Sequence, residues 1–335
     1  MEGMAKKAAE QIKRTMNHWH HIPHEEIHKD GFTRLTLAPK DIKSQIEALP
    51  APSAPPPLSA DVLKLKQKLS VLAAPADVAA AGANQRLNQK DLPQTEKDAF
   101  KNAVRKLVTD GAYKSLINIH SDMSHNMHGS MGPTGLLRFL AWHRRYILEF
   151  ERALLAADKA LRPNATMPVC LPYWHWIDPF PDWLEGFLPA NRPDNNTPPP
   201  ARRKKSPPEK PNQTDVDYII SGFASQMPGI NTNDYTRFTY GLEGWGKRQD
   251  GTSLPAHNHV HDWTGGIMSN TMYSPTDPVF WLHHGEVDRL WHIWQQQHDN
   301  SHPALTGNDR IMDPWPETYD AVRSIEALGY VYASN

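Results

Sequence analysis

The sequence contains a single cysteine, Cys170, among 335 residues. One cysteine excludes an internal disulfide and any zinc cluster built from cysteine thiolates. No apolar run approaches the ~18–20 residues of a membrane-spanning helix, and the first residues lack the apolar segment of a secretory signal. From these absences we expect a chain of the cytoplasm with no membrane partner.

An excess of charge of one sign is also missing. The chain has 36 Lys and Arg against 37 Asp and Glu, which gives a net charge of −1. Without a basic excess, a nucleic-acid partner is not expected. What the chain does contain is 18 His and 11 Trp. This combination suits a metal site surrounded by large apolar side chains.

Proline, with 30 residues, is about twice as frequent as the usual ~5% and is concentrated in two regions. The first lies in residues 1–84, which we interpret as an N-terminal extension carrying a histidine patch (His18 to His28) and the proline tract 48–58. Such a tract favours extended polyproline II and serves as a spacer or lid arm. The patch either binds metal or is a solvated segment. Residues 85–335 are expected to form the folded domain.

Hydrophobic periodicity in residues 85–335 predicts helices. Apolar residues recur at helical spacing over about 91–108, 111–120, 135–157 and 277–298. The second proline-rich region, 189–212, also carries many charges and predicts a surface loop. We therefore expect a mainly α protein, a helix bundle with long loops and little β structure.

The histidines fall at inward positions of several predicted helices. A lone histidine on an apolar stripe is most often a hydrogen-bonded core residue, but several on different helices are what a metal site in a bundle requires. Imidazole suits copper, zinc and iron, and spacing alone does not distinguish these metals. The candidates are His143 and His284 on two stripes, His257 and His261 four residues apart on one helix face, and His120 with His125 and His128 nearby.

Two blocks of sequence make the pattern specific. The first is HGSMGPTGLLRFLAWHRRYILEFERAL (128–154), and the second is HNHVHDWTGGIMSNTMYSPTDPVFWLHHGEVDRLWHIWQ (257–295). Over about 90–300 the chain resembles the tyrosinase family, whose two copper-binding blocks these segments match. The resemblance implies an enzyme with two copper ions. It also implies activity on phenols with dioxygen, namely ortho-hydroxylation of monophenols and oxidation of o-diphenols to o-quinones.

The resemblance assigns the metal ligands residue by residue. His120, His128 and His143 would bind the first copper, and His257, His261 and His284 the second. Two positions have competitors. His125 competes with His128, which Gly129 follows as the family pattern expects. His283 competes with His284, which both the family pattern and the helical stripe favour.

Further residues carry over from the same resemblance. Glu243 in LEGWG and Asn258 would hold a water that takes the proton of an incoming phenol, whose free pKa is about 10. The alternative for Glu243 is a surface-exposed glutamate. Phe280 resembles a phenylalanine stacked on a copper ligand. Asp262 would disfavour substrates with a carboxylate, and Thr271 aligns with a pocket-lining position or is a plain loop threonine.

Three features concern the structure around the site. His175 in LPYWHW stands where the family commonly has an acidic residue, which puts local hydrogen bonding in doubt. Asp288 and Arg289 resemble a pair that supports the site, and a simple buried ion pair is the alternative. Cys170 is expected to be a buried core thiol.

Other functions compete with this interpretation. A catechol oxidase or o-aminophenol oxidase would keep both coppers but lack monophenol hydroxylation. A hemocyanin-like dioxygen carrier and a structural zinc protein are weaker rivals. The N-terminal extension would act as a lid, an oligomerisation arm that makes a homo-oligomer, or a tail. If it plugs the pocket, removing residues 1–85 should raise activity.

Overall fold

A computed structural model of the chain describes residues 84–204, 209–221, 234–298 and 301–333. The N-terminal extension expected over residues 1–84, with its histidine patch and proline tract, lies outside the described residues except for Asn84. The domain expected from residue 85 onward is described from its first residue.

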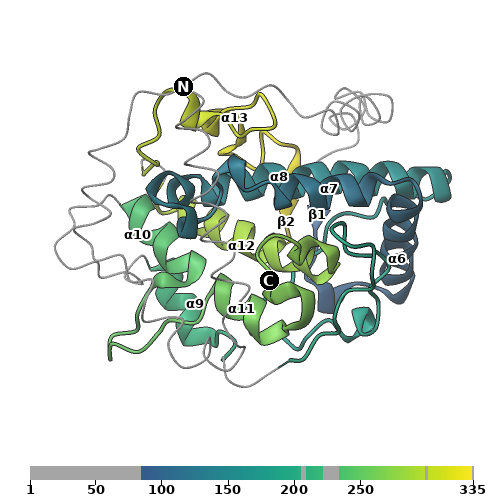
Figure 1. The fold of residues 1–335 in the computed structure, drawn as a ribbon, viewed down its shortest axis with the longest axis horizontal. Coiled ribbons are helices and arrows are strands. Elements are labelled where there is room, and N and C mark those ends of the chain that lie inside the picture. Colours follow the sequence, from purple (N-terminus) through teal and green to yellow (C-terminus); the bar gives the residue numbers. More distant parts are fainter. Residues whose placement is uncertain (1–83, 205–208, 222–233, 299–300, 334–335) are drawn as a thin grey trace. The chain divides into compact units, whose positions relative to one another are not determined.

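The described chain is mainly helical (Figure 1). Its α-helices are α6 (Gln94–Thr109), α7 (Ala112–Ser121), α8 (Pro133–Leu161), α9 (Gln213–Ile220), α10 (Asp234–Tyr240), α11 (His257–Thr264), α12 (Val279–Gln295) and α13 (Tyr319–Val322). Short 3-10 turns lie between them: η1 (Gln89–Asp91), η2 (Met123–His125), η3 (Gly129–Met131), η4 (Asp182–Leu184), η6 (Gly266–Ser269), η7 (Ser274–Thr276) and η8 (Gly307–Arg310). A π-helical turn, η5, covers Gly241–Trp245.

The helices expected over 91–108, 111–120, 135–157 and 277–298 correspond to α6, α7, α8 and α12. Helix α6 begins at Gln94 rather than at residue 91 because Pro93, with ψ 153°, has an extended backbone and no amide hydrogen to donate. None of the helices in the described part of the chain has the length and hydrophobicity that crossing a lipid bilayer requires.

Helix α8 is the centre of the fold. It begins at Pro133, where the missing amide hydrogen of proline costs no helical hydrogen bond, and Figure 1 shows it crossing the molecule with α6 at one end. Because α6, α10, α12 and α13 all pack against it, α8 buries more than the single apolar stripe that periodicity predicts. Its buried charged residues include Arg144, Glu149 and Glu151.

Two short parallel strands hold the ends of the described domain together. Strand β1 (Asn84–Arg86) pairs with β2 (Tyr330–Tyr332), with Arg86 opposite Tyr332. Arg86 is fully buried and bonds Glu151 of α8 at 2.6 Å and Asp288 of α12 at 3.1 Å. Its guanidinium lies 3.5 Å from the centre of the Tyr330 ring, which adds a cation–π contact. These contacts fasten both strands to the helical core.

The proline-rich segment 189–212 has no helix or strand among its described residues, 189–204 and 209–212, most of which are exposed or half-buried. This confirms the surface loop that its composition predicts. The loop is attached to the domain at several points: the amides of Arg203 and Lys204 donate to the carbonyl of Thr264, the last residue of α11, and the Arg202 side chain pairs with Asp277 at 2.6 Å. It therefore runs past the end of a helix that carries two of the candidate ligands.

Candidate metal centre

A first group of three histidines gathers on one side of α8. His120 lies on α7, His128 lies between η2 and η3, and His143 lies on α8. All three are buried, and one ring nitrogen of each lies within 4.8 Å of a ring nitrogen of the other two. The structure thus brings together the three side chains that the sequence assigns to the first metal.

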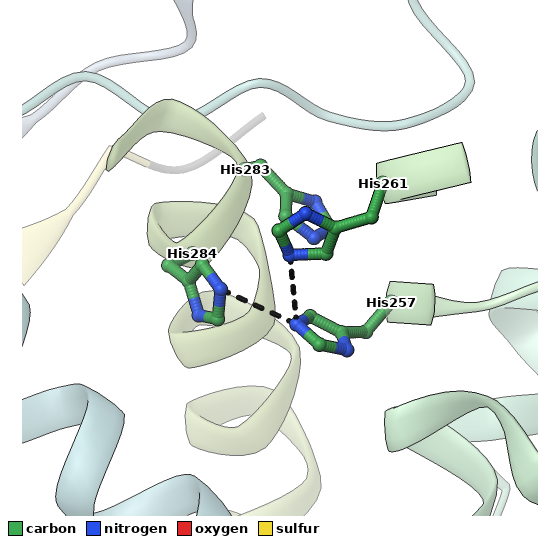
Figure 2. Close-up of side chains that lie close together, drawn as sticks. All are labelled: His257, His261, His283 and His284. Atoms are coloured by element: carbon green, nitrogen blue, oxygen red, sulfur yellow. Dashed lines mark hydrogen bonds between the residues drawn. The ribbon is translucent and has the colours of Figure 1, made fainter. Parts of the chain in front are cut away.

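A second group of four histidines lies beside it. His257 and His261 come from α11, and His283 and His284 from α12 (Figure 2). Their ring nitrogens also lie within 4.8 Å of one another. The Nε2 atom of His257 lies 3.1 Å from that of His261 and 3.3 Å from that of His284, the two contacts dashed in Figure 2. Three Nε2 atoms therefore converge, as in a set of metal ligands.

The two groups adjoin each other. The rings of His143 and His284 stack with centroids 4.5 Å apart and planes 14° apart. The ring of Phe280, one turn before His284 on α12, lies 4.2 Å from that of His284 and 5.1 Å from that of His120. Phe280 therefore contacts one histidine of each group, but its ring is tilted by 33° to that of His284 rather than stacked on it as the resemblance implies.

The structure separates His125 from its competitor His128. Nδ1 of His125 lies 2.6 Å from Oδ2 of Asp313, and its ring stacks on Trp142. Its nitrogen is not among those that gather around His120 and His143. This leaves His128 as the third member of the first group, the choice that the following glycine favours.

Hydrogen bonds at Nδ1 determine which nitrogen most of these histidines can offer to a metal. An Nδ1 that faces an oxygen acceptor carries the proton, so the lone pair lies on Nε2. Four histidines face such an acceptor: His120 faces the Met272 carbonyl (3.2 Å), His143 the Phe139 carbonyl (2.8 Å), His261 the Met268 carbonyl (2.8 Å) and His257 Oδ1 of Asn258 (2.9 Å). Their Nε2 atoms therefore present lone pairs to the two groups.

Electrostatics keeps these imidazoles neutral. Burial is the main cause that holds the pKa of His143, His257 and His284 well below the ordinary histidine value, and repulsion from neighbouring histidines lowers it further. Burial likewise lowers the pKa of His261 to about 3. Only the neutral form of histidine binds a metal. The site is thus ready for metal ions at neutral pH.

The residues fit two copper ions. In the first group, Nε2 of each histidine is buried and has no hydrogen-bond partner in the described chain. A buried nitrogen without a partner is costly, and coordination to a metal would satisfy it. No cysteine is near, and imidazole is a preferred ligand of copper. Two adjacent sets of neutral imidazoles are the donor set that a pair of copper ions needs.

Glu243 lies against the first group and is buried, so the alternative of a surface-exposed glutamate is wrong. Its two carboxylate oxygens accept the amide hydrogen of Gly129, at 2.7 and 3.0 Å, and Oε1 lies 3.8 Å from Nδ1 of His128. A β-carbon on Gly129 would come within 2.6 Å of Oε2. The residue after Glu243, Gly244, has φ 116°, and a β-carbon added to it would lie 3.0 Å from Cβ of Asn258. Two glycines thus let Glu243 and Asn258 approach the histidines.

The pair Asp288–Arg289 differs from the simple ion pair weighed from the sequence. Asp288 pairs with Arg144 and Arg86, whereas Arg289 pairs with Glu286 at 2.7 Å. Successive residues of a helix point about 100° apart, so neighbours rarely face each other. Both side chains nonetheless support α12, the helix that carries His284.

His175 and Cys170 lie outside both histidine groups. Nδ1 of His175 lies 2.7 Å from Oε1 of Glu286 on α12. His175, at the position where the family commonly has an acidic residue, is therefore hydrogen-bonded to a carboxylate of that helix. Cys170 is half-buried rather than fully buried, and desolvation raises the pKa of its thiol to about 12. An inert thiol agrees with the structural role expected for it.

The two expected pocket residues are partly or fully accessible. Asp262 is half-buried on α11, next to His261, and Thr271 is exposed in the turn after η6. Sequence reasoning missed Trp176, whose indole bonds His283 at 3.0 Å, and the amide of Gly129. For Trp176 the repeated tryptophans of LPYWHW were the available indication. A sequence alone does not indicate which residue donates a hydrogen bond from its backbone amide to a side chain of the site.

Comparison with known proteins agrees with this geometry. The family model described as the common central domain of tyrosinase matches residues 110–205 and 188–297. A tyrosinase of Streptomyces glaucescens is 34% identical over 278 residues, which covers 70% of this chain and 94% of the relative. A tyrosinase of Streptomyces antibioticus is 32% identical over 274 residues, with the same coverage.

Among solved structures, a functional unit of octopus hemocyanin superposes with a TM-score of 0.52 at 20% sequence identity. The match covers 75% of this chain and 68% of that chain, and it shows that the two share a fold. Taken with the sequence matches and the two groups of buried histidines, these findings establish that the chain belongs to the tyrosinase family, copper oxidoreductases with two copper ions that act on phenols with dioxygen.

Proposed function

We propose that this enzyme hydroxylates monophenols ortho to their hydroxyl and oxidises o-diphenols to o-quinones. His120, His128 and His143 would hold one copper, and His257, His261 and His284 the other. The observation that carries the proposal is the buried carboxylate of Glu243 beside the first histidine group. A pure catechol oxidase would have less need of a base at this position.

Bound copper would supply the electrons for dioxygen reduction and the oxygen transfer. The contribution of the chain begins with the proton of the incoming phenol, whose pKa of about 10 leaves it protonated at neutral pH. Glu243 has no arginine or lysine within ion-pair distance among the described residues, so its charge is not already neutralised by a cation. It can accept a proton, directly or through one water.

Asn258 would complete the water site. Its Oδ1 atom accepts a hydrogen bond from Nδ1 of His257 at 2.9 Å, so its amide nitrogen is the group that can donate to a water. The carboxylate of Glu243 would accept from the same water. The Gly129 amide fixes the orientation of that carboxylate, and the burial of His128 and His257 helps to keep bulk water away from the reacting ring.

Replacement of Glu243 by glutamine tests this role, since the amide keeps the shape but cannot take the proton. We expect monophenol hydroxylation to fall roughly 100-fold or more, with catechol oxidation changed less than about threefold. Glu149→Gln is the matched control, because Glu149 is also buried but pairs with Arg145 away from the histidines. An equal loss of both activities in Glu243→Gln would contradict the proposal.

One observation favours keeping a second candidate. A relative named grixazone synthase, from Streptomyces griseus, is 30% identical over 273 residues and matches 84% of that protein's length. An oxidase restricted to catechols or o-aminophenols is therefore the alternative. Dioxygen uptake by the copper-loaded wild type with tyramine and then with the matching catechol separates the two, because only the catechol would react if the alternative holds.

Asp262 and Thr271 are proposed to line the entrance of the substrate pocket. Asp262 follows His261 on α11 and is half-buried. A carboxylate there would repel phenolic acids and tolerate amines or neutral phenols. Thr271 lies on the η6–η7 segment between the two metal-binding helices, and there it would touch the ring of the substrate.

We also propose that residues 85–335 form the catalytic domain and that the preceding segment covers its pocket. The boundary has to respect β1, because Asn84 and Gln85 belong to the strand that pairs with β2. Removal of residues 1–85 would delete part of β1, so removal of residues 1–83 is the cleaner experiment. Raised activity with unchanged thermal stability would support a lid, and unchanged kinetics would contradict it.

A further inference from the structure

The second group contains one histidine more than a catalytic metal uses. Catalytic sites keep three protein ligands and an open position, whereas four ligands give the closed tetrahedral site typical of structural zinc. His257, His261, His283 and His284 all have a ring nitrogen within 4.8 Å of the others. A site with three protein ligands therefore requires that one of these four imidazoles does not bind the metal.

Trp176 forms a hydrogen bond with one of the four, His283. Its indole Nε1 lies 3.0 Å from Nδ1 of His283 (the nitrogens of His283 are seen in Figure 2), and both side chains are fully buried. An indole nitrogen can only donate. Nδ1 of His283 must therefore accept with its lone pair, and the ring proton must be on Nε2. In this state neither nitrogen of His283 has a lone pair for a metal.

Two other members of the group have the opposite arrangement. Nδ1 of His261 donates to the Met268 carbonyl, and Nδ1 of His257 donates to Oδ1 of Asn258. Each therefore has its lone pair on Nε2. His283 is packed among the ligands, with its ring 5.0 Å from that of His257 and 4.6 Å from that of His261. Only its hydrogen bond sets it apart.

We propose that Trp176 is a positioning residue that withholds His283 from the metal and so keeps the second copper position three-coordinate. The device has two consequences. An open position is left for dioxygen and substrate, and zinc is disfavoured because it cannot obtain a fourth imidazole. To recruit His283, the wild type would have to move the ring proton from Nε2, where it is buried without an acceptor, to Nδ1, where it would face the indole hydrogen; two buried donors instead of one would then lack an acceptor.

Trp176→Phe removes the indole donor and keeps an aromatic ring. In the metal-free full chain we expect this variant to bind zinc at least about tenfold more tightly than the wild type. The reason is that coordination of zinc by His283 breaks a buried hydrogen bond in the wild type but not in the variant. Zinc affinity is measured by competition with a coloured chelator. Cobalt(II), which takes the same ligands, should give a more intense visible spectrum in Trp176→Phe, as a tetrahedral site does.

Two further variants isolate His283. Trp174→Phe is the matched control, because Trp174 is buried in the same segment but donates to the carbonyl of Asp178; its zinc affinity should equal that of the wild type. The double variant Trp176→Phe/His283→Phe should return to the wild-type affinity, since the fourth ligand is gone. Unchanged zinc affinity in Trp176→Phe, an equal gain in Trp174→Phe, or a gain that persists in the double variant would overturn the proposal.

A measurement on the wild type covers the case in which Trp176→Phe does not fold. Nitrogen NMR of the histidine-labelled protein, loaded with zinc so that it is diamagnetic, reports which ring nitrogen carries the proton. The His283 signals are identified by their loss in His283→Phe. We expect a protonated Nε2 and an unprotonated Nδ1 for His283. A protonated Nδ1, or an Nε2 bound to the metal, would overturn the proposal.

Discussion

The metal-free enzyme should lose stability steeply as the pH falls below 6.5. Six histidines of the two groups, five of them buried and His261 half-buried, have a pKa held below its ordinary value, mainly by desolvation and further by repulsion between neighbouring imidazoles. They are His120, His143, His257, His261, His283 and His284. In the unfolded chain the same side chains titrate near pH 6.5. At pH 7.5 and above both states are almost entirely neutral, so nearly the full stability is present there.

The loss has a calculable size. Between pH 7.5 and pH 5.5 an unfolded histidine goes from about one-tenth to about nine-tenths protonated, whereas the folded one stays neutral. Each therefore costs about 1.4 kcal/mol, and six cost about 8 kcal/mol. Domains are typically stable by only about 5–15 kcal/mol. The decline continues as the pH falls toward the folded-state pKa, which is about 3 for His261. His259, with a pKa lowered to about 4, adds to the effect.

Urea unfolding of the metal-free full chain at several pH values between 5.5 and 7.5 measures this loss. Unfolding at pH 5.5 should take up about five protons, because the slope of stability against pH equals the difference in bound protons. The variant His143→Asn should reduce the loss by about 1.4 kcal/mol. Copper should protect the folded state, since it binds only neutral imidazole. An uptake below about two protons would refute the view that these imidazoles are neutral and buried.

Three further predictions follow from single contacts. Arg86→Met leaves Glu151 buried without its cation and Asp288 with Arg144 alone, and should cost about 3–5 kcal/mol in urea unfolding. The control Arg192→Met, at a pair with Asp194 in which both side chains are partly exposed, should cost less than about 1 kcal/mol; equal costs would argue against the buried cluster. Gly129→Ala places a methyl group against the Glu243 carboxylate and should displace it. Monophenol hydroxylation should then fall at least about tenfold, while the copper content stays at two per chain. Unaltered hydroxylation would show that the Gly129–Glu243 contact is dispensable. Asp262→Asn should raise kcat/KM for a phenolic acid several-fold relative to tyramine, and an unchanged ratio would remove Asp262 from substrate selection.

The grouping of buried histidines could be predicted from the sequence because the relevant information is local. His143 and His284 lie on helical stripes, and His257 and His261 are one turn apart, so helical periodicity alone turns them inward. The resemblance of the two sequence blocks to the tyrosinase family then indicated that the metal is copper. The surface loop 189–212 followed from its composition in the same way. Each of these inferences needs only neighbours within about one helix or loop.

The remaining choices depend on contacts between distant segments, which periodicity does not contain. His125 and His128 are three residues apart, and what separates them is Asp313, far along the chain, which binds His125. His283 and His284 are adjacent, and the indole of Trp176, more than a hundred residues earlier, distinguishes them. The burial of Glu243 likewise rests on the Gly129 amide. A single sequence gives no means of finding such partners.

The orientation of ligands in both groups depends on one short segment between α11 and α12. The carbonyl of Met268, in η6, accepts from His261 of the second group, and the carbonyl of Met272, four residues later, accepts from His120 of the first. The side chain of Asn270 fixes the turn between them, because its Oδ1 accepts from the amides of Met272 and Tyr273. Since backbone carbonyls set the proton position on both imidazoles, a single turn holds one histidine of each group with the lone pair of Nε2 available to a metal. This requirement gives a physical reason why the family pattern runs almost without interruption from His257 to His284 rather than marking the histidines alone.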